Sequence, residues 1–330
     1  MNRLFGRFFG ERGVILAYHR IAEVRPDPWG LAVSPAHFRE QLEVLAKYWH
    51  PLRLQEVVRA LKTGQRLPPR AVVLTFDDGY ADYVSNARPL LQQYGIPATL
   101  FVTCGKLDQE TAFWWDELAH LLLEPANLPE TLTLWVAGTA CHWELGAAAT
   151  YGDDERRRDR DRRAWEGKDG SRYAFHFSVW ERLRPLPDAE RELLLDEIRS
   201  WTGRKCSAPS GTRPLSSEEL SNLTRCELTE VGSHTLTHPL LPTLPVAAQR
   251  TEIAGSKRNL EEILEVEVES FAYPYGKYNN ETEFLVREAG FRCACTTETM
   301  KVGKDANPFT LPRIVILDSD GDQFLRRLHR

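Results

Sequence analysis

The chain has 330 residues and a formal net charge of −5 at pH 7, a length that suits one large α/β domain with an insertion, or two domains. The negative charge argues against a nucleic-acid partner, because such proteins carry a basic surface. We find no apolar stretch long enough to cross a bilayer and none of signal-peptide length at the N-terminus, so we expect a cytoplasmic protein.

Residues 1–12 combine arginines with leucine and phenylalanine side chains. A segment of this kind could make peripheral contact with a membrane surface. It is short and contains glycine, so the composition favours a frayed or packed terminal helix instead.

The first apolar run predicts a buried strand over residues 14–19, with His19 at its C-terminal end. Ser34-Pro35 then supplies an N-cap and a proline at the first helical position. An apolar stripe from Phe38 to Leu45 predicts the helix that follows, and Gly64 ends a second helix of the same kind.

Two further strands are predicted at 72–76 and 98–103, with a helix at about 82–94 between them. A strand–helix–strand unit of this length predicts parallel pairing. Asp77 and Asp78 follow the first of these strands. Neighbouring side chains at a strand end point in different directions, so one carboxylate can bind a metal while the other acts as a base. A simpler interpretation is that both only cap the next helix.

Residues 105–225 interrupt this alternation and are predicted to form an insertion that packs beside or over the site. A helix is expected from Phe113 to Leu123 and an isolated strand at 132–136. Every residue from 153 to 163 is charged, which indicates a solvated helix or a mobile loop.

Regular alternation resumes near residue 227. Together with the three strands above, four later segments make seven predicted core strands, the later ones being 227–232, 269–273, 291–296 and 313–317. His234 and His238 follow the first of these four. Two histidines four residues apart can face one side of a tight loop and bind one divalent ion, although such a pair is often only surface or core histidine.

The six cysteines have no metal-binding or redox spacing, since none forms a Cys-x-x-Cys pair. Cys293 and Cys295 share one face of a predicted strand and cannot bridge easily. We expect all six to be reduced and mostly buried, namely Cys104, Cys141, Cys206, Cys226, Cys293 and Cys295.

Three motifs resemble those of the NodB-type polysaccharide deacetylases of carbohydrate esterase family 4. Thr75-Phe76-Asp77-Asp78-Gly79 matches the first motif in full, and His234-Thr235-Leu236-Thr237-His238 matches the second. Ala272-Tyr273-Pro274-Tyr275 matches the third without its arginine. The resemblance covers about 13–104 and 226–317. It implies a distorted (β/α)7 barrel with 105–225 as a large insertion, and a site at the C-terminal strand ends.

By this resemblance, Asp78, His234 and His238 bind one divalent metal ion and Asp77 is the general base. Zinc is our first expectation, although the same ligands accept cobalt, nickel or iron. The rigid turn at Pro274 places the backbone N–H of Tyr275, which helps to stabilise the oxyanion.

Two parts of the family pattern are missing. Ala272 stands where the family has an arginine that orients the base, and Arg313 is our candidate replacement, unless it is a surface residue. The family also has a Leu-x-His motif near the end of the domain, and here Asp318 stands where that histidine would be. His19 is our candidate acid, because a barrel brings its first and last strands together; a merely buried histidine is the alternative.

The resemblance implies an enzyme that removes N-acetyl groups from an amino-sugar saccharide, such as a polysaccharide precursor or a lipid-linked saccharide. A deformylase of a lipid-linked amino sugar would use the same residues. A catalytically silent carbohydrate-binding relative is the alternative from another class. The intact Asp77, Asp78, His234 and His238 favour an enzyme, because a silent relative needs no base beside a metal.

Overall fold

The computed structural model describes residues 13–204, 212–223 and 227–329. Two compact units divide the chain: unit 1 comprises residues 1–23, 31–108 and 215–330, and unit 2 comprises 24–30 and 109–214. Unit 2 thus lies within the predicted insertion, with the short segment 24–30 in addition. The predicted membrane contact of residues 1–12, and Cys206 and Cys226, lie outside the described residues.

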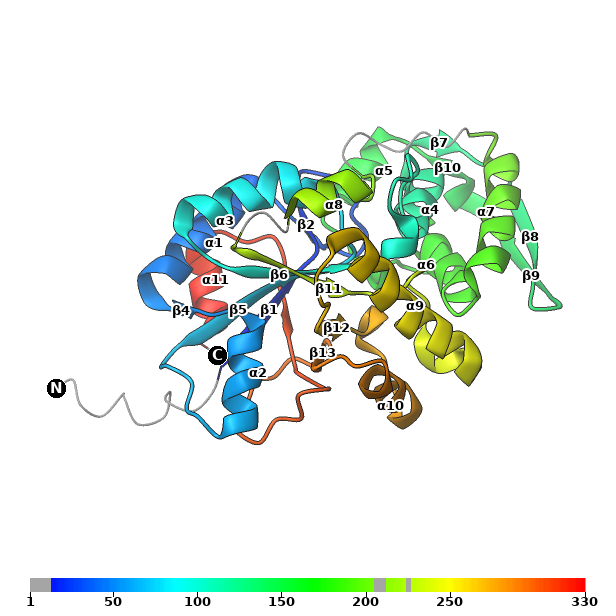
Figure 1. The fold of residues 1–330 in the computed structure, drawn as a ribbon. Helices are drawn as coiled ribbons and strands as arrows, with labels where there is room; N and C mark the ends of the chain where they lie inside the picture. Colours follow the sequence, from blue (N-terminus) through cyan, green and yellow to red (C-terminus); the bar gives the residue numbers. More distant parts are fainter. Residues whose placement is uncertain (1–12, 205–211, 224–226, 330) are drawn as a thin grey trace. The chain divides into compact units, whose positions relative to one another are not determined.

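Unit 1 is built on one parallel sheet in the order β13-β12-β11-β6-β5-β1-β14 (Figure 1). These are the seven predicted strands, so the distorted (β/α) barrel is confirmed. Their bounds are β1 Val14–Tyr18, β5 Ala71–Phe76, β6 Ala98–Val102, β11 Thr229–Ser233, β12 Ser270–Ala272, β13 Cys293–Cys295 and β14 Ile314–Val315.

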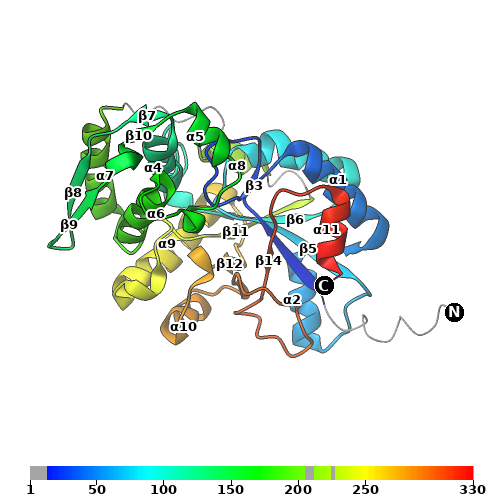
Figure 2. The same cartoon turned by 180° about the vertical axis from the view of Figure 1, so that it is seen from behind.

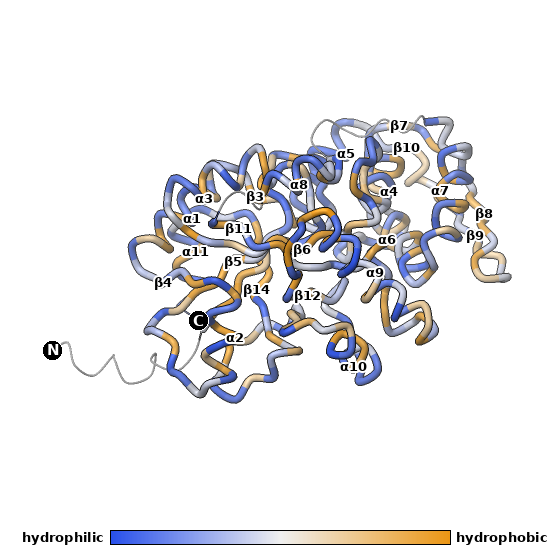
Figure 3. Tube along the Cα trace, in the orientation of Figure 1, coloured by the Kyte–Doolittle hydropathy of each residue, from blue (hydrophilic) through white to orange (hydrophobic). Residues whose placement is uncertain are grey.

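The strands are apolar because both faces of the sheet are covered. Every residue of β1, β5 and β6 is buried, and hydrophobic residues follow these strands in Figure 3. Strand β1 pairs in parallel with β5 on one side and with β14, the last strand of the sheet, on the other. These buried runs contain no charged residue, and the candidate site residues lie where strands end.

The segment 311–315 draws the two edges of the sheet together. Leu311 forms a parallel bridge with Cys295 of β13, and three residues later Ile314 pairs with Leu16 of β1. The sheet therefore curls into a partial barrel, and Arg313 lies between the two contacts.

Helices cover the outside of the sheet, and α1 and α11 pack side by side in both views (Figures 1 and 2). As predicted, Ser34 caps α1 by accepting a hydrogen bond from His37 N, and Gly64 ends α2 in the left-handed conformation. The helices of unit 1 are α1 Pro35–Tyr48, α2 Leu54–Thr63, α3 Arg88–Tyr94, α8 Ser217–Leu223, α9 Val246–Leu264, α10 Asn280–Glu288 and α11 Gly321–Leu328.

The shortest elements of unit 1 were not predicted, because two or three residues carry no periodicity. Strand β4 (His50–Pro51) adds to the edge of β5, and β2 (Arg20–Ile21) pairs with β3 (Ala32–Val33). A π-helical turn, η1 (Tyr83–Ala87), precedes α3. Single turns of 3-10 helix are η2 Cys104–Lys106, η5 Leu241–Thr243 and η6 Pro274–Gly276.

Unit 2 combines helices with short antiparallel strands. The strand predicted at 132–136 is not isolated: β8 (Thr131–Val136) forms a hairpin with β9 (Thr139–Glu144), because Gly138 allows the tight turn between them. The other elements are α4 Trp114–Leu123, β7 Ala126–Asn127, η3 Gly146–Ala149, β10 Thr150–Tyr151, α5 Asp153–Arg158, η4 Ala164–Glu166, α6 Arg172–Leu183 and α7 Asp188–Thr202.

The run of charged residues from 153 begins as the solvated helix α5, which buries none of its side chains. Arg157 pairs with Asp154 and Arg158 with Glu155, each one helical turn apart. Along the described part of the chain, no helix is long and apolar enough to cross a membrane. Cys104, Cys293 and Cys295 are buried and Cys141 is partly buried, and all four are free thiols as predicted.

Candidate active site

Three of the predicted residues meet at the C-terminal ends of β5 and β11, two strands on either side of β6. Asp78 follows β5 and the two histidines follow β11. Asp78 Oδ1 lies 3.5 Å from Nε2 of His234 and 3.5 Å from Nε2 of His238. All three side chains are buried, and their ligand atoms lie within 4.8 Å of one another. Two imidazole nitrogens and one carboxylate oxygen converging in this way fit a divalent ion such as zinc and leave further coordination positions open.

The ring of His234 is oriented by the chain that faces it. His234 Nδ1 lies 2.7 Å from the carbonyl oxygen of Ala272, at the end of β12. A carbonyl oxygen can only accept, so Nδ1 carries the proton and Nε2 presents its lone pair to the cluster. In the sequence, Ala272 stands out only because it occupies the place of an arginine. Its carbonyl nevertheless has a place in the site that no side-chain motif could indicate.

The backbone of the site is held in an uncommon conformation. Eight non-glycine residues have a positive φ in the described part of the chain, and four of them belong to the site: Asp78 (74°), Thr235 (70°), His238 (57°) and Tyr275 (58°). Each such residue costs of the order of 1–3 kcal/mol and persists only where its surroundings impose it. The concentration of strained residues around one cluster supports a functional role for it.

Asp77, the neighbour of Asp78, points to a different partner. Arg313 holds its carboxylate with two hydrogen bonds of 2.7 Å, Nη1 to Oδ1 and Nη2 to Oδ2. Arg313 also donates to Thr296 O (2.9 Å) and to Thr75 Oγ1 (3.0 Å). Both members of the pair are buried, with side-chain exposures of 0% for Arg313 and 2% for Asp77. Arg313 is therefore not a surface residue, and its guanidinium occupies the place expected for a replacement at Ala272.

This pairing keeps Asp77 ionised. Burial by itself raises the pKa of Asp77, but the charge and hydrogen bonds of Arg313 outweigh burial and lower that pKa to about 2. The carboxylate is thus a proton acceptor throughout the neutral pH range. Neither Asp77 nor Asp78 caps a helix, so the simpler interpretation of the pair does not hold.

His19 lies on the same side of the barrel, directly after β1. Its Nε2 is 3.9 Å from Asp77 Oδ2, and its side chain is 14% exposed. Burial lowers the pKa of His19 to about 4, in spite of the nearby Asp77 carboxylate. The imidazole is therefore neutral at pH 7. His19 was expected near the metal ligands without being one of them, and it lies beside Asp77 and outside the set of Asp78, His234 and His238. Its role as an acid stays a prediction.

Pro274 and Tyr275 lie in the turn η6, which is separated from the end of β12 by one residue, Tyr273. The ring of Tyr275 packs against His238, with 4.6 Å between the ring centroids. The positive φ of Tyr275 turns the backbone sharply at this point. The turn therefore belongs to the wall of the site, and the oxyanion role of the Tyr275 backbone N–H stays a prediction.

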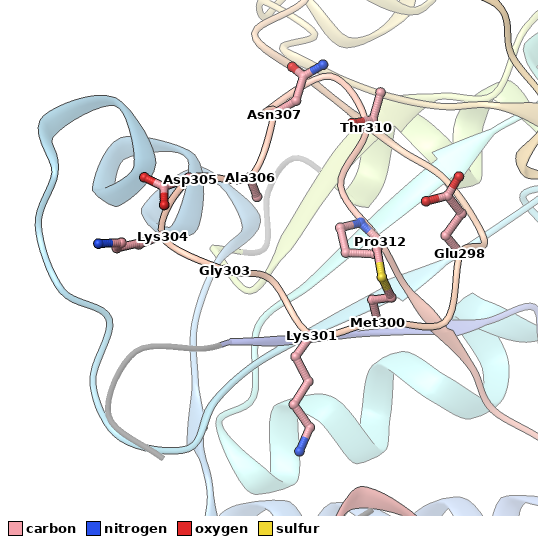
Figure 4. A pocket seen from close by; sticks show the side chains of 10 residues that line it. All are labelled: Glu298, Met300, Lys301, Gly303, Lys304, Asp305, Ala306, Asn307, Thr310 and Pro312. Carbon is pink, nitrogen blue, oxygen red and sulfur yellow. The ribbon is translucent and has the colours of Figure 1, made fainter. Parts of the chain in front are cut away.

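A surface pocket of about 420 Å³ lies in the long loop between β13 and β14 (Figure 4). Its walls come from residues between Glu298 and Pro312, including Lys301, Lys304 and Asp305. None of the predicted site residues lines it, and its mixed charges favour no single ligand chemistry. The converging carboxylates and histidines, and not this pocket, define the candidate active site.

Comparison with known proteins agrees with this geometry. The family model described as polysaccharide deacetylase matches residues 64–131 and 202–294, which include all three motifs. A poly-beta-1,6-N-acetyl-D-glucosamine N-deacetylase of Escherichia coli K12 is 33% identical over 86 residues, which is 26% of this chain and 13% of that protein. The chain thus spans only a small part of the length of that relative.

Solved structures share the fold over almost the whole chain. The Streptococcus pyogenes deacetylase PplD in complex with acetate superimposes with a TM-score of 0.60 at 19% identity, over 96% of this chain and 98% of that one. IcaB from Ammonifex degensii does so with a TM-score of 0.61 at 19% identity, over 97% of each chain. The matched family model and the curated relative identify the chain as similar to the polysaccharide deacetylases, and the solved structures show that it has the same fold.

Proposed function

We propose that this chain is a metal-dependent hydrolase that removes N-acetyl groups from an amino-sugar-containing saccharide. The observation that carries the proposal is that two adjacent carboxylates, Asp77 and Asp78, have different partners. Asp78 joins two histidines in a metal-binding set, whereas Arg313 keeps Asp77 ionised beside it. The names of the relatives, N-deacetylases of N-acetyl-glucosamine polymers, support the substrate class.

The donor set suits zinc first, and cobalt, nickel or iron as well. Asp78, His234 and His238 would hold the ion. When bound, a divalent ion supplies Lewis acidity that polarises an amide carbonyl and makes water more acidic. The remaining steps fall to the side chains and backbone of the chain itself.

Asp77 is the general base in this scheme. Amide hydrolysis requires that the attacking water lose a proton as it bonds to the carbonyl carbon. Asp77 is buried, ionised and not part of the metal-binding set, so it is free to accept that proton. Arg313 fixes the carboxylate in one orientation through two parallel hydrogen bonds.

His19 completes the proton transfer to the leaving amine. A neutral imidazole cannot act as an acid until it receives a proton. Asp77 lies 3.9 Å away and holds the proton taken from the attacking water, so it is the neighbouring group from which His19 would receive a proton. The backbone N–H of Tyr275, placed by the turn at Pro274, stabilises the negative charge on the carbonyl oxygen.

We expect purified protein to carry close to one divalent ion per chain. Replacement of Asp78 or His234 by alanine removes one of three ligands and should abolish most of this content, as measured by elemental analysis. His50→Ala is the matched control, because His50 is an exposed histidine of the same unit. Wild-type protein that stays metal-free after incubation with zinc, cobalt and nickel would refute the metal-binding set.

The activity itself is tested by the acid released from N-acylated amino-sugar saccharides, with the metal removed and then restored. Acetate release that depends on the restored metal supports the proposal. Formate release in its place indicates the deformylase. Saccharide binding without release of either acid, by protein that does bind metal, indicates the silent relative.

We expect His19→Ala to lower turnover by about 10²-fold, at the small end of the range for acid–base catalysis. The side chain is 14% exposed, so water can partly replace it as a proton donor. Metal content should be unchanged, because His19 is not a ligand. A His19→Ala variant with undiminished turnover would show that His19 is only a buried histidine.

A further inference from the structure

The loop between the two candidate histidine ligands is held by a carboxylate from another element. Glu252 lies in α9, and its Oε2 accepts hydrogen bonds from the backbone N–H groups of Leu236 (2.9 Å) and Thr237 (2.9 Å). Its other oxygen, Oε1, accepts from the Thr237 hydroxyl at 2.7 Å. Glu252 thus makes three hydrogen bonds to two of the three residues between His234 and His238.

The helix that carries Glu252 is fixed to the strand that carries the loop. Ser256, one turn further along α9, lies with its hydroxyl 2.6 Å from that of Ser233, the last residue of β11. Gly255 packs so closely on the Leu236 side chain that an added Cβ would lie 3.0 Å from it. Helix α9 therefore holds the Glu252 carboxylate at a fixed position relative to the loop.

The opposite side of the loop is held by residues 103–105, mainly through their backbone N–H groups. Cys104 N donates to Thr235 O (3.2 Å) and Gly105 N donates to Leu236 O (2.9 Å). An added Cβ at Gly105 would lie 2.6 Å from the Leu236 carbonyl oxygen, so only glycine allows this approach. The loop is thus clamped between the start of η2 on one side and Glu252 on the other.

The clamp is needed because the loop is strained. Thr235 and His238 both have a positive φ, and they flank the two residues that Glu252 holds. Without external contacts the chain would relax toward ordinary φ values, and such a relaxation would rotate His238 away from Asp78. Hydrogen bonds to an ionised carboxylate are stronger than those to neutral acceptors, so Glu252 can offset much of this strain.

We propose that Glu252 is a positioning residue that sets the affinity of the site for its metal ion. Its hydrogen bonds go to Leu236 and Thr237 and not to the ligand side chains, so it acts through the loop that carries them. The inference rests on the proposed function, since it takes Asp78, His234 and His238 as the ligands. It adds that tight metal binding also requires Glu252, which is not itself a ligand.

The test measures zinc affinity by competition with a chromogenic chelator, using the full chain. Residues that orient metal ligands typically contribute about 10–100-fold to affinity, and we expect Glu252→Ala to weaken zinc binding by that factor. Glu252→Gln keeps the shape and one acceptor oxygen, so its affinity should lie between those of wild type and Glu252→Ala. It also keeps the test valid if Glu252→Ala fails to fold.

Glu261 provides the matched control. It lies on the same helix, and its Oε1 accepts from Val268 N (3.0 Å) and pairs with Lys257 (2.7 Å). Glu261→Ala should lower thermal stability and leave zinc affinity unchanged. Equal affinity losses in the two alanine variants, or wild-type affinity in Glu252→Ala, would overturn the inference. Absence of zinc binding by the wild type itself would instead refute the proposed function.

Discussion

Replacement of Asp77 by asparagine is expected to lower turnover by about 10²–10⁴-fold, the usual contribution of a general base, while the metal stays bound. Asparagine has the same shape but does not accept a proton at neutral pH. Asp77 contacts Arg313 and lies outside the metal-binding set of Asp78 and the two histidines. The check is turnover and metal content measured on the same preparation.

The same variant leaves the buried Arg313 without its negative partner, so it should also be less stable. Turnover must therefore be measured below the melting temperature of the variant, as determined by circular dichroism. Asp78→Asn is the matched control, and it should lose the metal. If Asp77→Asn lost the metal as readily as Asp78→Asn, the division of roles between the two carboxylates would be wrong.

Arg313→Met should lower the free energy of unfolding by about 3–5 kcal/mol, because it leaves the Asp77 carboxylate buried without a partner. It should also change the titration of Asp77. Arg313 now lowers the pKa of Asp77 to about 2, against burial. Without the guanidinium, only the weaker effects of His234 and His19 still oppose burial, so that pKa should rise.

The sign of the pH dependence follows from this shift. In the wild type the pKa of Asp77 is lower in the folded chain than in the unfolded chain, where it is near 3.8. The stability gained from the pair is therefore present above about pH 3.8 and is lost as the pH falls toward 2. In Arg313→Met the acid limb of the pH–rate profile should move to higher pH, because the base is protonated sooner.

Arg199 offers the matched control for Arg313. It forms a similar two-point pair with the buried Glu117 in unit 2. Arg199→Met should cost stability without moving the acid limb, whereas Arg313→Lys should restore part of the wild-type profile. An acid limb that is the same in Arg313→Met and the wild type would show that Arg313 does not tune the base.

The sequence by itself was enough to predict the elements that local chemistry fixes. Strands β1, β5 and β6 are mainly apolar runs with every residue buried, so their composition alone distinguishes them from the polar turns around them. Asp77 and Asp78 are adjacent at a strand end, where successive side chains diverge, so their separate partners were expected before any contact was known. His234 and His238 belong to one short loop, and their convergence is likewise a local property.

Tertiary structure alone decided what distant segments contribute. Arg313 stands 236 residues from Asp77, and nothing local in Leu311-Pro312-Arg313 separates a buried guanidinium from a surface one. The curl of the sheet decides it, because Leu311 pairs with β13 and Ile314 with β1, which turns the residue between them toward Asp77. Glu252 is an ordinary helical glutamate in sequence. It acquires a role only because α9 packs where the strained His234–His238 loop presents two backbone N–H groups that need an acceptor.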